Sequence, residues 1–268
     1  MRRPRFQRLG LRLVALGYLA LILVGPLAIV FWRTFEDGFA PAWDALTTPE
    51  TINAFKLTLI ITAIAVPVNT VFGIVAALAI VRRKFPGKSL LNAFIDLPLA
   101  LSPVVVGLSL FLLYGREGWF GGWFDRHGIE ILFALPAMVI ATIFVSIPFV
   151  AREVVPTLVE IGDEQEQAAR TLGAGVWQTF WRITLPSIRW AVIYGVILTT
   201  ARCLGEYGAV AVVSGRLQGE TETATLRVQE RYESFDLAGA YAISIVLALI
   251  AIVVLVAMTT IRPREEAA

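Results

Sequence analysis

The chain has 268 residues, of which 57% are hydrophobic and only 16% are charged. Soluble domains are typically about 45–50% apolar and about 25% charged, so this composition favours an integral membrane protein over one or two soluble domains. A net charge of +2 gives no support to a nucleic-acid partner, and a single Cys (Cys203) and a single His (His127) exclude an intrachain disulfide and a site of several histidines around a metal.

Six long runs with little or no charge follow one another along the chain. About 20 apolar residues of helix span the hydrocarbon core of a bilayer, so each run is a predicted span. The first run is longer than the apolar core of a signal peptide, which is about 7–15 residues, and we expect it to be retained. The spans are predicted at 13–32, 57–81, 89–115, 131–150, 190–214 and 237–261, with a polar loop at 33–55. This pattern predicts an all-α integral membrane protein with one transmembrane domain over residues 1–268.

Basic residues predict which segments face the cytoplasm, because cytoplasmic loops are enriched in Lys and Arg. If the N-terminus is inside, the inner segments hold most of the basic residues that lie outside the spans. They include Arg2, Arg3, Arg5, Arg8, Arg12, Arg262 and Arg264. The sequence therefore predicts a multi-pass protein with both termini and segment 161–189 in the cytoplasm. Prolines in four of the six spans predict broken or kinked helices.

Segment 161–189 is the longest polar interruption in the second half of the chain. Residues 165–172 favour a helix, and Gly173 is typical of a helix C-terminus. A second short helix is predicted to begin at Val176 and to end where Pro186 stops it.

The second of these helices has an apolar face. Val176, Phe180 and Ile183 recur at helical spacing, and Trp177 and Trp181 lie beside them. One interpretation is that this face rests on the membrane surface or on the protein's own spans. The other is that its aromatic side chains anchor a partner protein, as aromatic residues commonly do at interfaces.

The same stretch resembles the signature cytoplasmic loop of ABC-importer permeases, which reads Glu-Ala-Ala and then Gly, Ile and Leu-Pro at fixed spacing. The matching residues are Gln167, Ala168, Ala169, Gly173, Ile183, Leu185 and Pro186. The resemblance implies the type I importer architecture, in which this loop is a coupling helix that docks in a separate ATPase subunit, with Trp177 and Phe180 on the docking face. Gln167 departs from the family's Glu, and Glu166 beside it is expected to compensate.

The chain carries no P-loop, since Gly87, Lys88 and Ser89 imitate only the end of that motif. The resemblance assigns ATP hydrolysis to a separate chain. We therefore expect a transport subunit rather than an enzyme, with ATP and Mg on the partner ATPase and no cofactor on this chain.

Longer segments resemble the sulfate and thiosulfate permeases, specifically the W-type member of a permease pair. They are 65–73, 96–98, 102–107, 148–153 and 202–215. The resemblance implies import of sulfate or thiosulfate through a bacterial inner membrane. It also implies a second homologous permease, two ATPase subunits and an external solute-binding protein as partners. Molybdate and tungstate permeases share the core at 205–209 and are the alternative within this class.

Two charges, Arg202 and Glu206, lie in the fifth predicted span and share one helix face. One hypothesis is an ion pair that fixes helix packing. The other places them on the anion path, where Arg202 partly offsets the charge of a dianion. Glu206 would then keep Arg202 from binding the anion too tightly. Ser102 and Thr199 are possible donors on that path, although such residues often bond their own helix backbone. Asp96, in the third span, is expected to cap or pair rather than to bind the anion.

A gradient-driven secondary anion transporter is the rival from a different class. Such proteins usually contain internal structural repeats, which this sequence does not show. A membrane enzyme is disfavoured by the single His and by the lack of clustered acidic residues in one span.

Overall fold

The computed structural model describes residues 13–36 and 38–261, and these form helices and loops without a strand. The basic residues up to Arg12 and beyond Ile261, on which part of the predicted topology depends, lie outside the described residues. The elements in chain order are the π-helical turn η1 (Ala20–Val24), α2 (Gly25–Phe35), α3 (Phe39–Thr47), α4 (Pro49–Arg82), α5 (Lys88–Ala100), α6 (Pro103–Tyr114), α7 (Gly121–Arg126), α8 (Leu135–Ser146), α9 (Pro148–Glu160), α10 (Glu164–Thr171), α11 (Val176–Thr179), the π-helical turn η2 (Phe180–Thr184), α12 (Leu185–Leu204), α13 (Gly208–Val213), α14 (Ala224–Glu233) and α15 (Leu237–Ile261).

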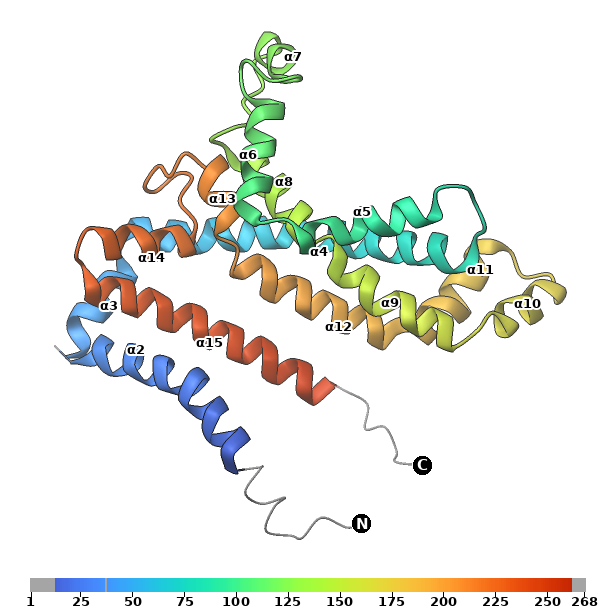
Figure 1. Ribbon diagram of the computed structural model, residues 1–268, viewed down its shortest axis with the longest axis horizontal. Coiled ribbons are helices and arrows are strands. Elements are labelled where there is room, and N and C mark those ends of the chain that lie inside the picture. Colours follow the sequence, from blue (N-terminus) through green and yellow to red (C-terminus); the bar gives the residue numbers. More distant parts are fainter. Residues whose placement is uncertain (1–12, 37, 262–268) are drawn as a thin grey trace.

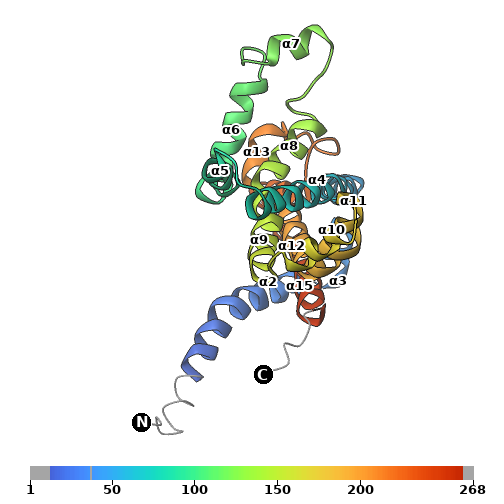
Figure 2. The same cartoon turned by 90° about the vertical axis from the view of Figure 1, so that its right-hand side faces the viewer.

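Five helical segments in the described part of the chain are long and apolar enough to cross a bilayer. They are Leu13–Phe35, Pro49–Arg82, Leu135–Glu160, Val176–Leu204 and Leu237–Val254. α5 and α6 are bent by 112° relative to each other, so they are not counted among these five. Together they would form a sixth, broken span. The molecule is an elongated bundle in which α4, α9, α12 and α15 run lengthwise, while α6 and α7 project to one side (Figure 1). A view turned by 90° shows the same projection (Figure 2).

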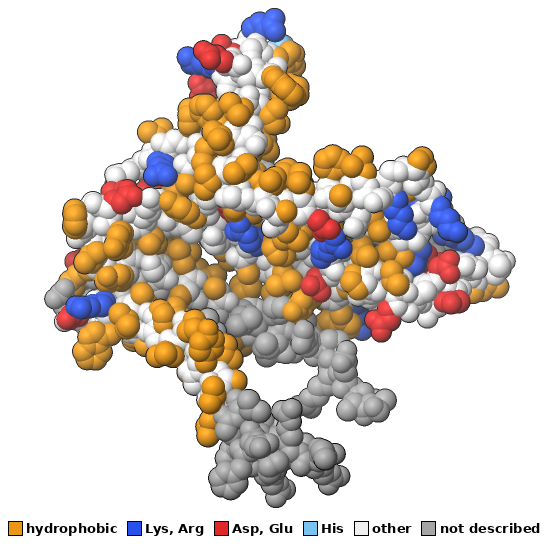
Figure 3. Space-filling model, in the orientation of Figure 1, with side chains coloured by type: hydrophobic (Ala, Val, Ile, Leu, Met, Phe, Trp, Pro, Cys, Tyr) orange, Lys and Arg blue, Asp and Glu red, His pale blue; other side chains and the backbone are white. Residues whose placement is uncertain are grey.

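Many hydrophobic side chains are visible on the face seen in Figure 3, over both the bundle and the projecting arm. Charged side chains lie at the two ends of the bundle, at the tip of the arm and in a few places along the middle of the bundle (Figure 3). Single large hydrophobic groups are common on any protein surface, but exposed hydrophobic groups in the numbers seen here indicate contact with lipid or with another protein.

The second span is much longer than predicted. Thr48 caps α4 by accepting a hydrogen bond from the Thr51 amide, and Pro49 occupies the first turn, where its missing N–H is harmless. The helix has 34 residues, which corresponds to about 51 Å at 1.5 Å per residue. The prediction of a polar loop over 33–55 is wrong, since α3 and the first turns of α4 occupy most of it.

Three predicted spans differ from the helices that form. The predicted span 89–115 is two helices, because the chain is extended at Leu101 and Ser102. The predicted span 131–150 continues through α9 to Glu160. The predicted span 190–214 is interrupted after Leu204 and resumes as α13. The break in span 89–115 agrees with the prediction from its prolines, whereas the break after Leu204, in a span without proline, was not predicted.

Pro186 does not end a helix, contrary to the prediction. It lies in the first turn of α12, which continues directly from α11 through η2. The Leu185 amide bonds the carbonyl of Phe180, five residues back, as a π-helical turn requires. This wider turn accommodates the proline at the point where a regular α-helix would clash with its ring.

The lengthwise helices meet at Val150, which is fully buried. Gly73 of α4 and Gly195 of α12 pack directly against it from two sides. A Cβ atom on Gly73 would lie 2.6 Å from Val150 Cβ, and one on Gly195 would lie 2.8 Å from Val150 Cα. The small residues therefore let α4, α9 and α12 approach closely, as small residues do in membrane helix bundles.

A second core joins the projecting arm to the bundle. Its buried residues come from α4, α6, α8, α13 and α14. Gly107 of α6 lies close to the backbone of α13, where an added Cβ would be 2.7 Å from the Ala209 carbonyl oxygen. The interrupted fifth span thus supplies a short helix that anchors the arm.

Candidate coupling loop and anion path

The loop between α9 and α12 lies at one end of the bundle, where α10 and α11 project beyond the other helices (Figure 1). Its outermost side chains are apolar: Leu172 is 88% exposed, Val176 76% and Trp177 75%. Phe180 and Ile183 are half-buried against the chain itself. The predicted apolar face is therefore split, and its outward half is available to a partner.

The signature glycine has a clear structural role. Gly173 follows α10 with φ of +84°, a left-handed conformation that favours glycine. Its amide bonds the Arg170 carbonyl, and the Ala174 amide bonds the Ala169 carbonyl, so the last carbonyls of α10 are satisfied. The turn between the two helices of the loop is thus built into the backbone at this position.

The first three residues of the signature differ in how far they are exposed to solvent. Gln167 and Ala168 are exposed and Ala169 is half-buried. Glu166 is 6% exposed and turns toward the body of the protein, where it accepts hydrogen bonds from Arg82 Nε at 3.1 Å and from Thr184 Oγ1 at 2.9 Å. Glu166 therefore makes its charged contact with the protein itself, while Gln167 lies at the exposed surface, and the expected compensation stays a prediction.

Arg82, at the end of α4, makes two further contacts. Its Nη1 donates to the Leu158 carbonyl at 3.0 Å and its Nη2 donates to the Gly162 carbonyl at 2.6 Å. The sequence pattern gave no sign that Arg82 and Glu166 pair. The two residues are far apart in the chain, and neither belongs to the signature.

Arg202 and Glu206 form an ion pair at the C-terminal end of α12. Arg202 Nη1 lies 2.6 Å from Glu206 Oε2, and the two side chains are 28% and 2% exposed. Glu206 Oε1 also accepts a hydrogen bond from the Ala209 amide at 2.9 Å, in the first turn of α13. Glu206 therefore joins the two helices across the break, while Arg202 keeps part of its guanidinium accessible.

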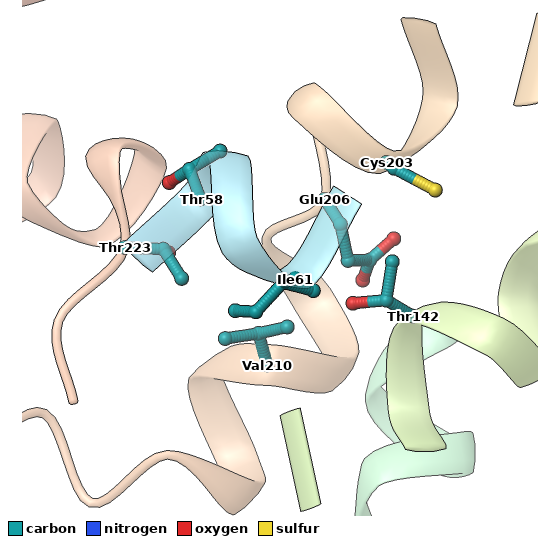
Figure 4. A pocket seen from close by; sticks show the side chains of 7 residues that line it. All are labelled: Thr58, Ile61, Thr142, Cys203, Glu206, Val210 and Thr223. Atoms are coloured by element: carbon teal, nitrogen blue, oxygen red, sulfur yellow. The ribbon is translucent and has the colours of Figure 1, made fainter. Parts of the chain in front are cut away.

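The Glu206 carboxylate lines a small cavity of about 10 Å³. The other lining residues are Thr58, Ile61, Thr142, Cys203, Val210 and Thr223. Figure 4 shows the carboxylate pointing toward Thr142, below the end of the helix that carries Cys203. The space suffices for about one water molecule and is too small for a tetrahedral oxyanion.

The two hydroxyls predicted for the path have different surroundings. Thr199 is buried and donates to the Gly195 carbonyl of its own helix at 2.7 Å. Ser102 is exposed in the break between α5 and α6. The residue that follows it, Pro103, packs against Gly208 at the start of α13, so two helix breaks lie side by side.

Asp96 pairs, as expected. Both of its carboxylate oxygens accept hydrogen bonds from Arg152 of α9. The side chains are 37% and 40% exposed. Asp96 lies eight positions after the start of α5 and Arg152 eight positions before the end of α9, which is about 12 Å along each helix axis.

Helix α14 lies at the end of the bundle opposite the coupling loop (Figure 1). Its Arg227 is 4% exposed and pairs with Glu222 at 3.3 Å and Glu230 at 3.1 Å. Burial raises the pKa of the Glu222 carboxyl above its usual range, and the nearby Arg227 opposes this shift. The Ala224 amide bonds Thr58 Oγ1 at 2.9 Å, which ties α14 to α4.

Comparison with known proteins identifies the chain's relatives. Residues 69–266 match the family model described as binding-protein-dependent transport system inner membrane component. The sulfate transport system permease protein CysW of Synechocystis is 51% identical over 91% of this chain and 88% of its own length. The sulfate transport system permease protein CysT of Escherichia coli K12 is 37% identical over 93% of this chain and 90% of its own length.

Solved structures with a similar fold are also known. A bacterial ABC transporter that imports the acidic polysaccharide alginate has a chain that superposes with a TM-score of 0.80, covering 97% of this chain and 96% of its own. A second structure of such a transporter, with an alginate pentasaccharide-bound periplasmic protein, gives a TM-score of 0.79 over 98% of this chain and 96% of its own. Sequence identity is 17% in both, so the likeness concerns the fold alone.

Proposed function

Because this chain belongs to the family of binding-protein-dependent transport system inner membrane components, we propose that it is the membrane-spanning subunit of an ATP-driven importer of sulfate and thiosulfate. The observation that carries the choice of substrate is the 51% identity to a sulfate permease over 91% of the chain. The sequence analysis predicted import of sulfate or thiosulfate, which agrees with this function. The helical fold with several apolar spans also agrees with it.

The proposed role of segment 161–189 is to bind a separate ATPase subunit and to transmit its ATP-driven movement to the membrane spans. Its exposed apolar groups, Leu172, Val176 and Trp177, form the proposed docking surface. ATP and Mg would bind to that partner, and this chain would need no cofactor of its own. Trp177 suits a central anchor in such an interface, because tryptophan is enriched among the residues that contribute most to binding.

The proposed assembly contains a second homologous permease, two ATPase subunits and an external solute-binding protein. Relatives of this chain include both CysW and CysT permeases, which supports a pair of different permeases. The alginate transporter was solved with a periplasmic protein, which supports an external binding protein here. The proposed orientation in the bacterial inner membrane places both termini and the coupling loop in the cytoplasm.

The proposed anion path passes Arg202. Its guanidinium is partly exposed beside the break between α12 and α13, with the charge of Glu206 close behind it. Partial compensation of a dianion suits a transporter, because a bound anion must also be released. Ser102 is accessible in the neighbouring break, whereas Thr199 is buried and bonded to its own helix and would act at most by packing.

The function is tested by reconstituting the four kinds of subunit in liposomes and measuring radioactive sulfate uptake. Uptake should require both ATP and the binding protein, and unlabelled thiosulfate should compete. Competition by molybdate but not by thiosulfate would favour the molybdate and tungstate alternative. Uptake by this permease without any ATPase, driven by an ion gradient, would contradict the proposal and identify a secondary transporter.

The path is tested separately with Arg202→Gln in the same assembly. Sulfate uptake should fall while binding-protein-stimulated ATP hydrolysis persists, because the proposed contact with the anion is lost. The double variant Arg202→Gln/Glu206→Gln removes the unpaired buried carboxylate that the single change leaves. Arg216→Gln, at an exposed arginine of the outer segment, is the control. Normal uptake with normal hydrolysis in both Arg202 variants would reject the role.

A further inference from the structure

The coupling loop is held to the rest of the protein by very few contacts. In α10, whose eight residues are all described, Glu166 is the only buried one. The segment that carries it is bounded by Gly162 at φ +64° and Gly173 at φ +84°, where the backbone turns sharply. The orientation of α10 therefore depends strongly on the contacts of one carboxylate.

Those contacts reach two separate parts of the chain. Glu166 Oε2 accepts from Arg82 Nε, at the inner end of α4, and Glu166 Oε1 accepts from Thr184 Oγ1, at the start of α12. Arg82 in turn bonds the carbonyls of Leu158 and Gly162, which belong to the end of α9 and the turn after it. We call the group of Glu166, Arg82 and Thr184 the clasp.

The chemistry of the clasp suits positioning. The Glu166 and Arg82 side chains are 8% and 15% exposed, so both are largely removed from water. A buried ion pair adds little net stability, because desolvation offsets much of the attraction, but it strongly disfavours any arrangement that separates the charges. An arginine with several fixed donors also specifies geometry better than a lysine would.

The clasp has a direct mechanical connection to the opposite end of the protein. Arg82 ends α4, and Thr58 of the same helix bonds the Ala224 amide of α14. These two positions on α4 are separated by about 36 Å along the helix axis at 1.5 Å per residue. A displacement of the loop that moves the inner end of α4 is thus transmitted along a continuous helix toward the outer segment.

We propose that Glu166 and Arg82 are positioning residues that fasten the coupling loop to α4, so that movement imposed by the ATPase is passed to this helix. The proposal rests on the proposed function and adds the route by which the loop acts. Without the clasp, the docking surface can still bind the ATPase and permit ATP hydrolysis. The loop would then move without carrying α4, and hydrolysis would be uncoupled from transport.

The decisive experiment uses Glu166→Gln in the complete reconstituted importer. The amide keeps the size of the side chain and can still accept from Thr184, but it loses the charge that holds Arg82. A hydrogen bond to a charged group contributes at least about 1.5 kcal/mol, so we expect the number of ATP molecules hydrolysed per sulfate imported to rise roughly tenfold or more. A merely structural role would lower uptake and hydrolysis in proportion and leave this ratio unchanged, which would overturn the proposal.

Two further variants sharpen the test. Arg82→Lys keeps the positive charge but cannot reach Glu166 and both carbonyls at once, and it should raise the same ratio. Glu164→Gln makes the identical chemical change at an exposed position of the same helix and should leave the ratio at the wild-type value. A rise in the Glu164 variant equal to that in the Glu166 variant would contradict the specific role of the clasp.

A measurement on the isolated permease separates the clasp from the proposed function. Amide hydrogen exchange over 164–171 should be faster in Glu166→Gln than in the wild type, while Glu164→Gln should match the wild type. If exchange over 164–171 were the same in Glu166→Gln as in the wild type, the clasp would be overturned, whichever substrate the importer transports. Absence of sulfate uptake by the wild-type importer, together with faster exchange in Glu166→Gln, would instead reject the proposed substrate and retain the clasp.

Discussion

Asp96 and Arg152 place a carboxylate and a guanidinium about 12 Å from one end of each of their helices, in segments counted among the candidate membrane spans. Ionised side chains at such depth are costly unless they pair or face water or protein. The bidentate contact satisfies both groups, and the partial exposure of the pair shows that this face borders something other than the protein's own core. At the residue scale, pairing explains how the span tolerates these charges.

Asp96→Asn should destabilise the protein because it leaves Arg152 without a counter-charge. Breaking a fully buried pair costs about 3–5 kcal/mol, and the partial exposure here reduces the expected cost to about 1–2 kcal/mol. Asp96→Asn/Arg152→Gln should cost less than Asp96→Asn alone. Unfolding of detergent-solubilised protein measures both, with Arg33→Gln, which breaks the exposed pair with Glu36, as the control. Additive losses in the double variant would contradict this account.

Glu222 predicts a pH effect whose sign follows from its raised pKa. The folded state holds the proton more tightly than the unfolded state, so this group's contribution to stability is greatest below its ordinary pKa and is lost as pH rises through the raised pKa. Compared with Glu222→Gln, the wild type should gain thermal stability as pH falls through this window. Thermal unfolding at a series of pH values measures the difference. A difference that is independent of pH, or that shrinks as pH falls, would contradict the assignment.

At the scale of elements, the coupling loop combines an outward apolar surface with an inward polar attachment. Leu172, Val176 and Trp177 point away from the bundle, while Glu166 and Thr184 point into it. The direction of each side chain decides whether it contacts a partner or the protein itself. This separation allows the docking surface and the clasp to be altered independently.

Trp177→Ala should weaken binding of the ATPase subunit without lowering the stability of the isolated permease. Truncation of an interface anchor costs at least about 2 kcal/mol, which is roughly a thirtyfold rise in Kd. The side chain is 75% exposed, so the fold loses little. Gln178→Ala, at the next exposed position, is the control. Unchanged affinity for the ATPase in the Trp177 variant would place the docking surface elsewhere.

Gly195→Ala should force α12 and α9 apart. The added Cβ would lie 2.8 Å from Val150 Cα, and overpacking of this kind costs typically about 1–3 kcal/mol. Val150→Ala should not rescue the variant, because the clash is with the backbone. Gly25→Ala, at a helical glycine with open space around it, should be nearly neutral. Thermal unfolding measures all three, and a neutral Gly195→Ala would contradict the close packing.

At the scale of the whole molecule, polar segments lie at the two ends of a lengthwise bundle. The coupling loop occupies one end and α14 the other, with α4 extending between them (Figure 1). Exposed Arg83, Lys84 and Lys88 lie at the same end as the coupling loop. The positive-inside tendency therefore supports a cytoplasmic position for that end.

The orientation can be tested with single cysteines in a Cys203→Ser background. Leu172 and Phe235 are 88% and 89% exposed and lie at opposite ends, so they form a matched pair. A membrane-impermeant maleimide should label Phe235→Cys in intact spheroplasts and Leu172→Cys only after the membrane is permeabilised. Labelling of Leu172→Cys in intact cells would invert the proposed topology.

Much of this protein follows from the sequence alone. The apolar runs required a membrane protein, because so little polar surface cannot cover a soluble fold. The spacing from Gln167 to Pro186 marked the segment that we propose as the coupling loop, and four-residue spacing predicted that Arg202 lies beside Glu206. These features depend on composition or on residues within one or two helical turns of one another. The order of residues along the chain is enough to predict them.

Other features were decided by tertiary structure. The inward turn of Glu166 depends on Arg82, which lies 84 residues away, and the pairing of Asp96 depends on Arg152, 56 residues away. The breaks in the third and fifth spans lie where Pro103 packs on Gly208, and a π-helical turn lets the chain pass Pro186. Local sequence cannot specify such contacts, because hydrophobicity places a segment in the membrane but does not determine which neighbour satisfies its interrupted backbone.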